Sequence, residues 1–267
     1  MERKIKIIGW YASLMHLAPP PEQVAFFSFI AAVAAAFVSM GAYAWLGARR
    51  DADVSGKSGQ FLGGAGEFPL HWFMWAISPV ERTSLAAGLT PDFYNYVGLV
   101  LGLMGGVLIA AGRLELAGWA IVLCGIADVL DGRIARLTNV ASSFGDFIDS
   151  TFDRFVEAAA FLGFAWYLRD TRWGPLLAGA AIAGSLLVSY ARARGEVHGV
   201  VCTGGFMQRA ERMVLTALVC FLGPPVSAAL HLPHGLLAQW TLALITVGTF
   251  ATAVYRTAWI AARLRNG

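Results

Sequence analysis

The sequence predicts an all-α, polytopic membrane protein, and three observations lead to that prediction. Of the 267 residues, 57% are hydrophobic and only 14% are charged, and the mean hydropathy is +0.61. A soluble domain has about 45–50% apolar and about 25% charged residues. The apolar residues also gather in long uncharged runs, several of which can cross a bilayer core of ~30 Å. We therefore expect a six-transmembrane-helix core, an additional N-terminal hydrophobic helix and an interfacial amphipathic helix.

The first 67 residues form a predicted N-terminal extension. Three consecutive prolines, Pro19 to Pro21, end any earlier helix, and the uncharged run from Val24 to Gly47 is long enough for one extra transmembrane helix. Residues 49–67 are rich in glycine, serine and charge, which is typical of a linker. Basic residues flank the apolar run on both sides, so the positive-inside rule leaves its orientation open. Residues 68–267 then form one membrane domain.

The segment from Pro69 to Ala87 is predicted to lie in the membrane interface. It interleaves aromatic residues such as Trp72 and Trp75 with charged Glu81 and its neighbours. Such a segment is too polar to span the membrane, and its tryptophan rings suit the depth of the lipid headgroups. We expect an amphipathic helix that leads into the core.

Six apolar segments form the predicted core. Their glycine and alanine content suits close helix packing in lipid, and Gly98, Gly102 and Gly106 repeat at the spacing of a helix contact. The segments cover about 92–111, 114–136, 144–168, 173–193, 213–224 (or to 230) and 236–262.

Basic residues of the predicted loops gather on one side of this core. The other side carries only Arg113, Arg169 and Arg172. The positive-inside rule assigns the richer side to the cytoplasm, so we expect a multi-pass protein of the cell (inner) membrane. The arginines of the richer side are Arg82, Arg133, Arg136, Arg192, Arg194, Arg209, Arg212, Arg263 and Arg265.

Four aspartates lie at the cytoplasmic ends of the second and third core segments. On a helix, Asp128 and Asp131 share one face, and Asp149 and Asp153 share a face of the next helix. The connection, residues 138–143, is short and polar, which predicts antiparallel neighbours whose acidic faces meet. Each carboxylate at membrane depth costs about 2.5–3.5 kcal/mol on insertion scales, so the cluster needs compensating positive charge.

Divalent cations are the better compensation for this cluster. A salt-bridged helix pair is the alternative, with Arg133, Arg136 and Arg154 nearby in the sequence. Carboxylate oxygens suit Mg²⁺ or Mn²⁺, and neither thiols nor imidazoles lie in the cluster to favour softer metals. We predict two such cations, an arrangement that recurs where phosphate or pyrophosphate bonds are cleaved.

The two acidic stripes also carry Gly132 and Gly145. A missing side chain at these positions lets a large ligand approach the backbone, and Arg136 is placed to reach a phosphate at the same end. Helix packing is the alternative explanation for both glycines.

Together these residues form a pattern of fixed spacing: Asp128, Asp131, Gly132, Ala135, Arg136, Gly145, Asp149 and Asp153. The pattern resembles the signature motif of the CDP-alcohol phosphotransferase (phosphatidyltransferase) family at every specified position. The resemblance covers roughly residues 78–265 and implies that CDP-diacylglycerol donates its phosphatidyl group to an alcohol, with release of CMP. One departure is Pro91-Asp92-Phe93-Tyr94-Asn95, where many members read Pro-Asn-x-x-Thr.

The resemblance also implies roles for the motif residues and a homodimeric assembly. Asp153 would be a metal ligand and also the general base that accepts the proton of the acceptor hydroxyl. The metal ligands would be Asp128, Asp131, Asp149 and Asp153. The residues that hold the CDP moiety would be Gly132, Ala135, Arg136 and Gly145.

A second region concerns the acceptor. Residues 189–196 and 204–212 resemble the corresponding region of bacterial phosphatidylinositol-phosphate synthases, which implies inositol 1-phosphate as the acceptor. Arginine suits a phosphate because of its bidentate fork. Simple anchoring at the lipid headgroups is the alternative. The candidate acceptor-phosphate residues are Arg194, Arg209, Arg212 and Arg192.

Other functions remain as alternatives at this point. The same reaction with glycerol 3-phosphate, inositol, serine or a phospholipid as acceptor fits the aspartate motif equally well. A cation transporter with intramembrane carboxylates is a different class, but it needs acidic residues along a path through the membrane. The net charge of +3 suits anionic lipid and is too small to indicate nucleic-acid binding.

Overall fold

The computed structural model describes residues 21–46 and 67–266, and over these residues the chain is helical without strands. The described helices are α2 (Pro21–Trp45), α3 (Glu67–Ala86), α4 (Pro91–Ala110), α5 (Leu114–Leu137), α6 (Ser143–Tyr167), α7 (Gly174–Val197), α8 (Arg209–Ala229) and α9 (Leu236–Asn266). The predicted all-α class is confirmed. The predicted linker, apart from its last residue, and the basic residues that flank α2 lie outside the described residues.

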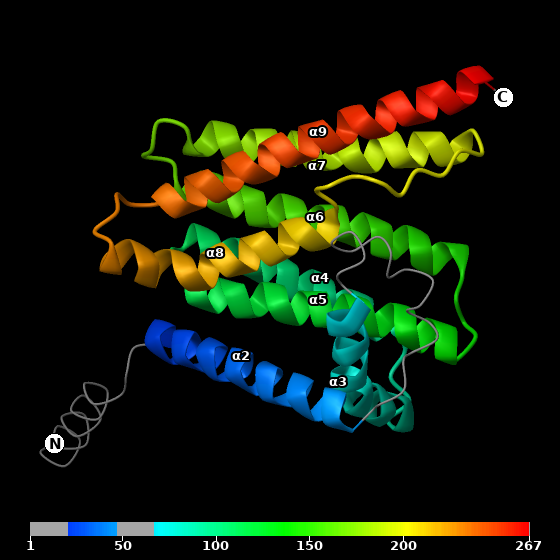
Figure 1. Cartoon of the computed structure of the whole chain (residues 1–267), viewed down its shortest axis with the longest axis horizontal. Helices are drawn as coiled ribbons and strands as arrows, with labels where there is room; N and C mark the ends of the chain where they lie inside the picture. The colour runs from blue at the N-terminus through cyan, green and yellow to red at the C-terminus, as the bar shows by residue number, and fades with distance from the viewer. Residues whose placement is uncertain (1–20, 47–66, 267) are drawn as a thin grey trace, which may run out of the picture.

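Helices α4 to α9 run side by side as a bundle, while α3 crosses the bundle near one end and α2 lies against its outside (Figure 1). Among the described helices, α2, α4, α7, α8 and α9 are long and apolar enough to cross a membrane. Helices α5 and α6, of 24 and 25 residues, are as long, but they carry the charged motif residues. The transverse path of α3 suits a helix at the membrane interface.

Glycines determine how closely α4 and α6 approach. A Cβ atom built at Gly106 would lie 2.5 Å from the carbonyl oxygen of Ala159, and one built at Gly102 would overlap Val156. Side chains at these two positions would therefore push the helices apart. The predicted glycine contact is confirmed for Gly102 and Gly106, whereas Gly98 faces α5 at ordinary contact distance.

Several helix ends differ from the prediction. Helix α7 continues to Val197 and α9 to Asn266, about one turn further, and basic residues in their last turns suit the negative end of the helix dipole. Helix α8 begins at Arg209 rather than Met213, because the arginines of its first turn pair with carboxylates inside the protein. It also continues past Pro224, so the shorter of the two predicted spans is wrong.

Helix α2 runs parallel to α5, and its C-terminal end lies beside α3. Trp119, near the start of α5, donates from Nε1 to the Ala25 carbonyl oxygen at 3.0 Å. Trp72 of α3 donates from Nε1 to Ser39 Oγ at 3.0 Å, near the end of α2. An ion pair joins α3 to Arg133, near the C-terminal end of α5. The structure thus defines, relative to the bundle, the orientation that the flanking charges left open.

Candidate active site

The aspartates of the sequence motif lie on facing ends of α5 and α6. Helix α5 ends where Asn139 adopts a φ of 57°, a left-handed conformation that asparagine tolerates. Helix α6 then begins with Ser142 as its N-cap, whose hydroxyl accepts a hydrogen bond from the Gly145 amide at 3.1 Å. This short turn reverses the chain, so α5 and α6 run antiparallel with α4 packed against both, and their acidic residues lie at the same end.

Three of the four predicted carboxylates form a compact group. One oxygen from each of Asp128, Asp131 and Asp149 lies within 4.8 Å of the others. Opposite ligands of an octahedral Mg²⁺ ion lie about 4.2 Å apart, twice the metal–oxygen distance of about 2.1 Å. The donor set and its spacing therefore fit a hard divalent cation, as carboxylate oxygens prefer.

The fourth carboxylate, Asp153, pairs with an arginine of α8. Arg209 Nη2 lies 2.6 Å from Asp153 Oδ1, and its Nη1 lies 2.9 Å from Asp128 Oδ1. One guanidinium therefore bridges α5 and α6 and supplies positive charge to the cluster. The sequence pointed to other arginines for this compensation. Arg133 instead pairs with Glu81 on α3.

A narrow recess adjoins the cluster on the side of α4. Tyr94 and Asn95, in the first turns of α4, are buried and line this recess together with Asp128 and Asp131. Both belong to the pentapeptide that departs from the family pattern, whose role the sequence left open. The structure brings them next to the predicted metal ligands.

The predicted CDP-binding residues occupy the last turns of α5 and the first turn of α6. A Cβ atom at Gly132 would meet only the Arg136 guanidinium, at 3.2 Å, and one at Gly145 would meet only Ser142 Oγ, at 3.5 Å. Neither glycine contacts another helix closely, so the packing explanation has no support here. Ala135, half-buried, lies between them in the sequence and completes the set.

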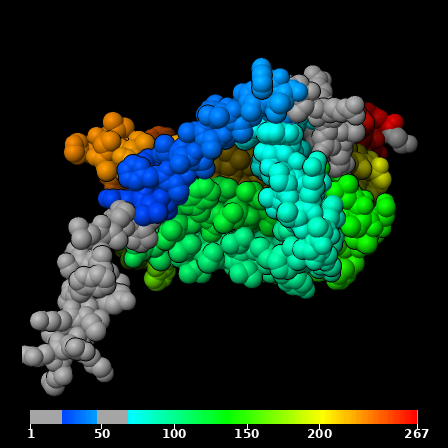
Figure 2. Space-filling view, turned by 90° about the horizontal axis from the view of Figure 1, so that it is seen from below, coloured from blue at the N-terminus to red at the C-terminus, as the bar shows by residue number. Residues whose placement is uncertain are grey.

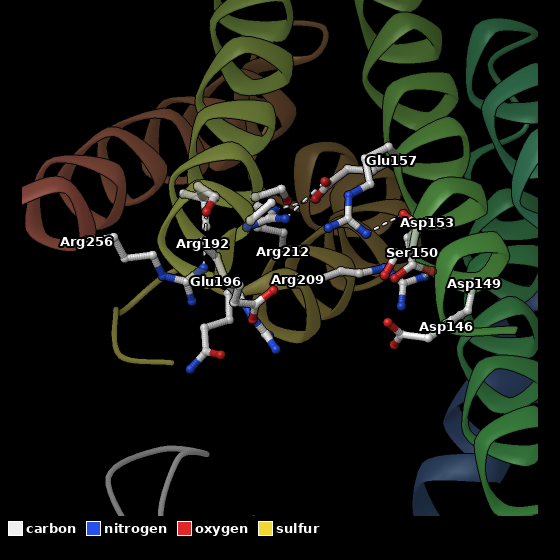
Figure 3. A pocket seen from close by; sticks show the side chains of 15 residues that line it. Asp146, Asp149, Ser150, Asp153, Glu157, Arg192, Glu196, Arg209, Arg212 and Arg256 are labelled. Carbon is white, nitrogen blue, oxygen red and sulfur yellow. Dashed lines mark hydrogen bonds and ion pairs between the residues drawn. The ribbon is translucent and has the colours of Figure 1, made fainter. Parts of the chain in front are cut away.

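A cavity of about 410 Å³ opens on the other side of the cluster, between α6, α7, α8 and α9 (Figure 3). Asp149 and Asp153 form one wall of this cavity. Within the described chain, five arginines line it: Arg154, Arg192, Arg209, Arg212 and Arg256. A cavity of this size and charge suits a small anionic molecule.

Two of these arginines are buried and hydrogen-bonded to other groups of the protein. Arg212 is 2% exposed; its Nε and Nη2 donate to the Glu157 carboxylate, the latter at 3.0 Å, and its Nη1 donates to the Met207 carbonyl oxygen at 2.8 Å. Arg256 is also buried and donates to the carbonyl oxygens of Gly204 and Val188. They hold the loop between α7 and α8 against the bundle and so shape the cavity.

The acceptor arginines predicted from the sequence do not all lie together. Arg192, Arg209 and Arg212 line the cavity, and Arg192 pairs with Glu196 one turn later at 2.7 Å. Arg194 lines a separate apolar groove between α7 and α9. Two residues apart on a helix means about 200° of rotation, so the two α7 arginines point to opposite sides. This corrects the expectation that Arg194 joins the others.

Arg256 was not among the residues predicted from the sequence. The sequence did contain a signal, because Arg256 is a single charge within the long apolar run of α9. An isolated ionisable residue inside a membrane segment usually faces the protein interior and has a partner there.

Comparisons with known proteins agree with this geometry. A family model described as CDP-alcohol phosphatidyltransferase matches residues 89–252. The phosphatidylinositol phosphate synthase of Mycolicibacterium smegmatis is 31% identical over 185 residues, covering 66% of this chain and 81% of that protein. The Mycobacterium tuberculosis H37Rv protein of the same name is 30% identical over 188 residues, covering 68% and 85%.

Solved structures of the Mycobacterium tuberculosis phosphatidylinositol phosphate synthase share the fold. The form with manganese and citrate has a TM-score of 0.60 and 28% sequence identity, covering 68% of this chain and 87% of that one. The form with CDP-DAG bound has a TM-score of 0.59 and 28% identity, covering 68% and 92%. The family match does not include α2 or α3.

Proposed function

Because this chain belongs to the CDP-alcohol phosphatidyltransferase family and is therefore a membrane phosphatidyltransferase, we propose that it transfers a phosphatidyl group from CDP-diacylglycerol to inositol 1-phosphate. The products are phosphatidylinositol phosphate and CMP. The observation that supports this choice of acceptor is the arginine-lined cavity, which shares Asp149 and Asp153 with the carboxylate cluster. A relative named phosphatidylinositol phosphate synthase supports the same acceptor.

We propose that Asp128, Asp131, Asp149 and Asp153 hold two divalent cations, Mg²⁺ or Mn²⁺. The compact group of three carboxylate oxygens supports this, as does the similar Mycobacterium tuberculosis structure in complex with manganese and citrate. When bound, the cations would polarise the pyrophosphate of the donor and offset the charge that develops on the departing CMP.

The residues that would bind the donor and act as the general base lie at the same end of α5 and α6. Gly132, Ala135, Arg136 and Gly145 would hold the CDP moiety, since the two glycines leave the backbone open at that end. Asp153 would accept the proton of the acceptor hydroxyl as that oxygen bonds to the phosphatidyl phosphorus. The bond from phosphorus to the CMP oxygen breaks in the same step, and CMP leaves with the bonding electrons.

The acceptor phosphate would lie among the arginines of the cavity. Arg192 is half-exposed, and Arg209 contributes two donors that already face carboxylates. The third guanidinium nitrogen of Arg209, Nε, is buried and has no hydrogen-bond partner within the described chain. A phosphate oxygen at this position would supply a charge-assisted bond. Arg212 and Arg256 already donate to protein groups, so they would mainly shape the cavity wall. Arg192 and Arg209 would be the first to contact the phosphate.

We further propose a homodimer in the cell (inner) membrane with the active site facing the cytoplasm. The gathering of basic residues at the end of the bundle that carries the acidic cluster supports this orientation. Residues 68–267 would form the catalytic membrane domain, and residues 1–67 would form an extension. The cation-transporter alternative is disfavoured because the described carboxylates of the motif gather at one end of the bundle.

The test is CMP release by the purified protein with CDP-diacylglycerol and Mg²⁺ or Mn²⁺. Inositol 1-phosphate, inositol, glycerol 3-phosphate and serine are supplied in turn at equal concentration, and the lipid product is identified by mass spectrometry. We expect release with inositol 1-phosphate well above the other acceptors. Release with another acceptor alone would overturn the acceptor assignment and keep the reaction.

A further inference from the structure

Helix α2 is the described element that the proposed reaction does not yet use. It lies outside the matched family range of residues 89–252. Most of its described side chains are exposed on the outside of the bundle, and only two of them are fully buried. The role of α2 is therefore inferred from its contacts with α3, α5 and α8.

The N-terminal half of α2 makes a specific aromatic contact with the bundle. Phe29 stacks on Phe221 of α8 with ring centroids 4.0 Å apart and an interplanar angle of 8°. Trp119 of α5 meets the same Phe221 edge-on at 5.5 Å, and its Nε1 donates to the carbonyl oxygen of Ala25 and to the hydroxyl of Ser28. Three helices are thus joined at the end of the bundle away from the carboxylates.

The C-terminal half of α2 contacts α3 instead of the bundle. Tyr43 is buried and packs against Phe68 and Trp75 of α3, with both pairs of ring centroids 5.6 Å apart. Trp72 of α3 also bonds Ser39. Because α3 is in turn ion-paired to α5, the three helices form a frame that is closed at both ends.

A hollow lies inside this frame. Figure 2 shows it between α2, α3 and the surface of α4 and α5, with α8 at its back. A Cβ atom built at Gly125 of α5 would meet nothing within 4 Å, and Val214 and Leu218 of α8 are 50% and 39% exposed. On α2, the half-buried Ala36 lies on the same side as Phe29, two turns earlier. The side chains named here, of Val214, Leu218, Phe29 and Ala36, are apolar.

The hollow and the candidate active site lie along the same side of α5, because Gly118, Gly125 and Gly132 recur at seven-residue steps. Gly118 of α5 contacts Phe221 at the closed end, and Gly132 of the motif lies fourteen residues further along α5. This distance is about 21 Å at 1.5 Å per residue, roughly two thirds of the apolar core of a bilayer. A lipid whose phosphates lie at the carboxylate cluster would therefore have an acyl chain at the depth of this hollow.

We propose that the frame of α2, α3 and α5 holds one acyl chain of the lipid donor, with Phe29, Phe221 and Trp119 as the stop for the end of that chain. The inference rests on the proposed function, since it takes CDP-diacylglycerol as the donor. Helix α2 then determines which chain lengths the enzyme accepts. A second copy of the chain would not fit a hollow that α2 and α3 already enclose.

The first test measures kcat/KM for a series of CDP-diacylglycerol donors that differ only in chain length. Phe29→Ala enlarges the closed end, so the preference shifts toward longer chains, by about fourfold for each added methylene group that becomes buried. Phe27→Ala is the matched control, because Phe27 is 66% exposed on the same helix. An unchanged chain-length profile for Phe29→Ala would overturn the proposal.

The second test fills the hollow. Ala36→Trp should raise KM for long-chain donors about fifteenfold, the factor expected when roughly two methylene groups lose their apolar site, and leave short-chain donors unaffected. Ala35→Trp, at an exposed neighbouring position, is the control. Equal effects of both variants would refute the acyl-chain site. CMP release by the unmodified protein is measured first, so that failure of the reaction itself is distinguished from failure of this inference.

Discussion

Glu157 and Arg212 form a buried ion pair whose removal has an effect that can be worked out from the structure. Arg212 is 2% exposed and Glu157 is 5% exposed, and two guanidinium nitrogens reach the carboxylate. Glu157→Ala leaves the guanidinium with one bond from Nη1 to the Met207 carbonyl oxygen. Breaking a buried pair from one side costs about 3–5 kcal/mol of folding free energy, because the remaining charge is desolvated and unpaired.

The double variant Glu157→Leu with Arg212→Met separates stability from function. Replacing both charges by apolar groups of similar volume is often neutral, or stabilising by about 1–4 kcal/mol, so we expect recovery of the stability that the single variant loses. Chemical unfolding in detergent micelles, followed by circular dichroism, measures each free energy. If the loss of unfolding free energy in the double variant equals the sum of the losses in Glu157→Leu and Arg212→Met, the two residues do not act as an isolated buried pair.

The same double variant also tests whether this pair shapes the acceptor cavity. Arg212 anchors the loop before α8 through Met207 and lines the cavity beside Arg209. We expect KM for inositol 1-phosphate to rise while KM for the lipid donor stays constant. Equal changes in both values would mean that the pair supports the whole site and has no particular role at the acceptor.

Three further predictions concern the carboxylates and the helix packing. Asp153→Asn should lower kcat about 10²- to 10⁴-fold, the usual contribution of a general base; full activity would remove this role. Chelation with EDTA should abolish CMP release, and Mg²⁺ or Mn²⁺ should restore it to the unmodified protein but not to Asp131→Asn; restoration in both would exclude Asp131 as a ligand. Gly106→Val should lower the unfolding midpoint, since its Cβ would overlap the Ala159 carbonyl oxygen, whereas Gly125→Ala should not.

The sequence predicted the parts of the fold that depend on helical periodicity. Uncharged runs defined the helices, and three- and four-residue steps placed Asp128, Asp131 and Asp149 on facing stripes. The short connection before Ser142 predicted antiparallel helices with the acidic residues at the same end, and the structure brings these carboxylates together there, with α4, rather than close packing of α5 on α6, joining the two helices. These features are local, so a single sequence is sufficient to infer them.

Contacts between distant helices could not be predicted in the same way. Arg209 lies 81 residues from Asp128, and its bridge to Asp153 depends on how α8 packs against α5 and α6. Arg192 and Arg194 point to opposite sides of α7, and only the packing of α7 shows that Arg192 faces the cavity while Arg194 faces another groove. The partners of Arg256 could not be predicted, because they are backbone carbonyl groups, which leave no charge pattern in the sequence.

The position of Arg209 links the two halves of the proposed reaction. Its Nη1 and Nη2 contact one carboxylate on each of α5 and α6, and the same side chain lines the acceptor cavity. A guanidinium in this place holds Asp128 and Asp153 in fixed relative positions through two charge-assisted bonds. In the proposed reaction it would also present positive charge to the acceptor phosphate, so that the same group would align the acceptor hydroxyl and the proposed base. Lysine, with a single ammonium group on a flexible stem, cannot make both contacts in a fixed plane, which explains why arginine suits this position.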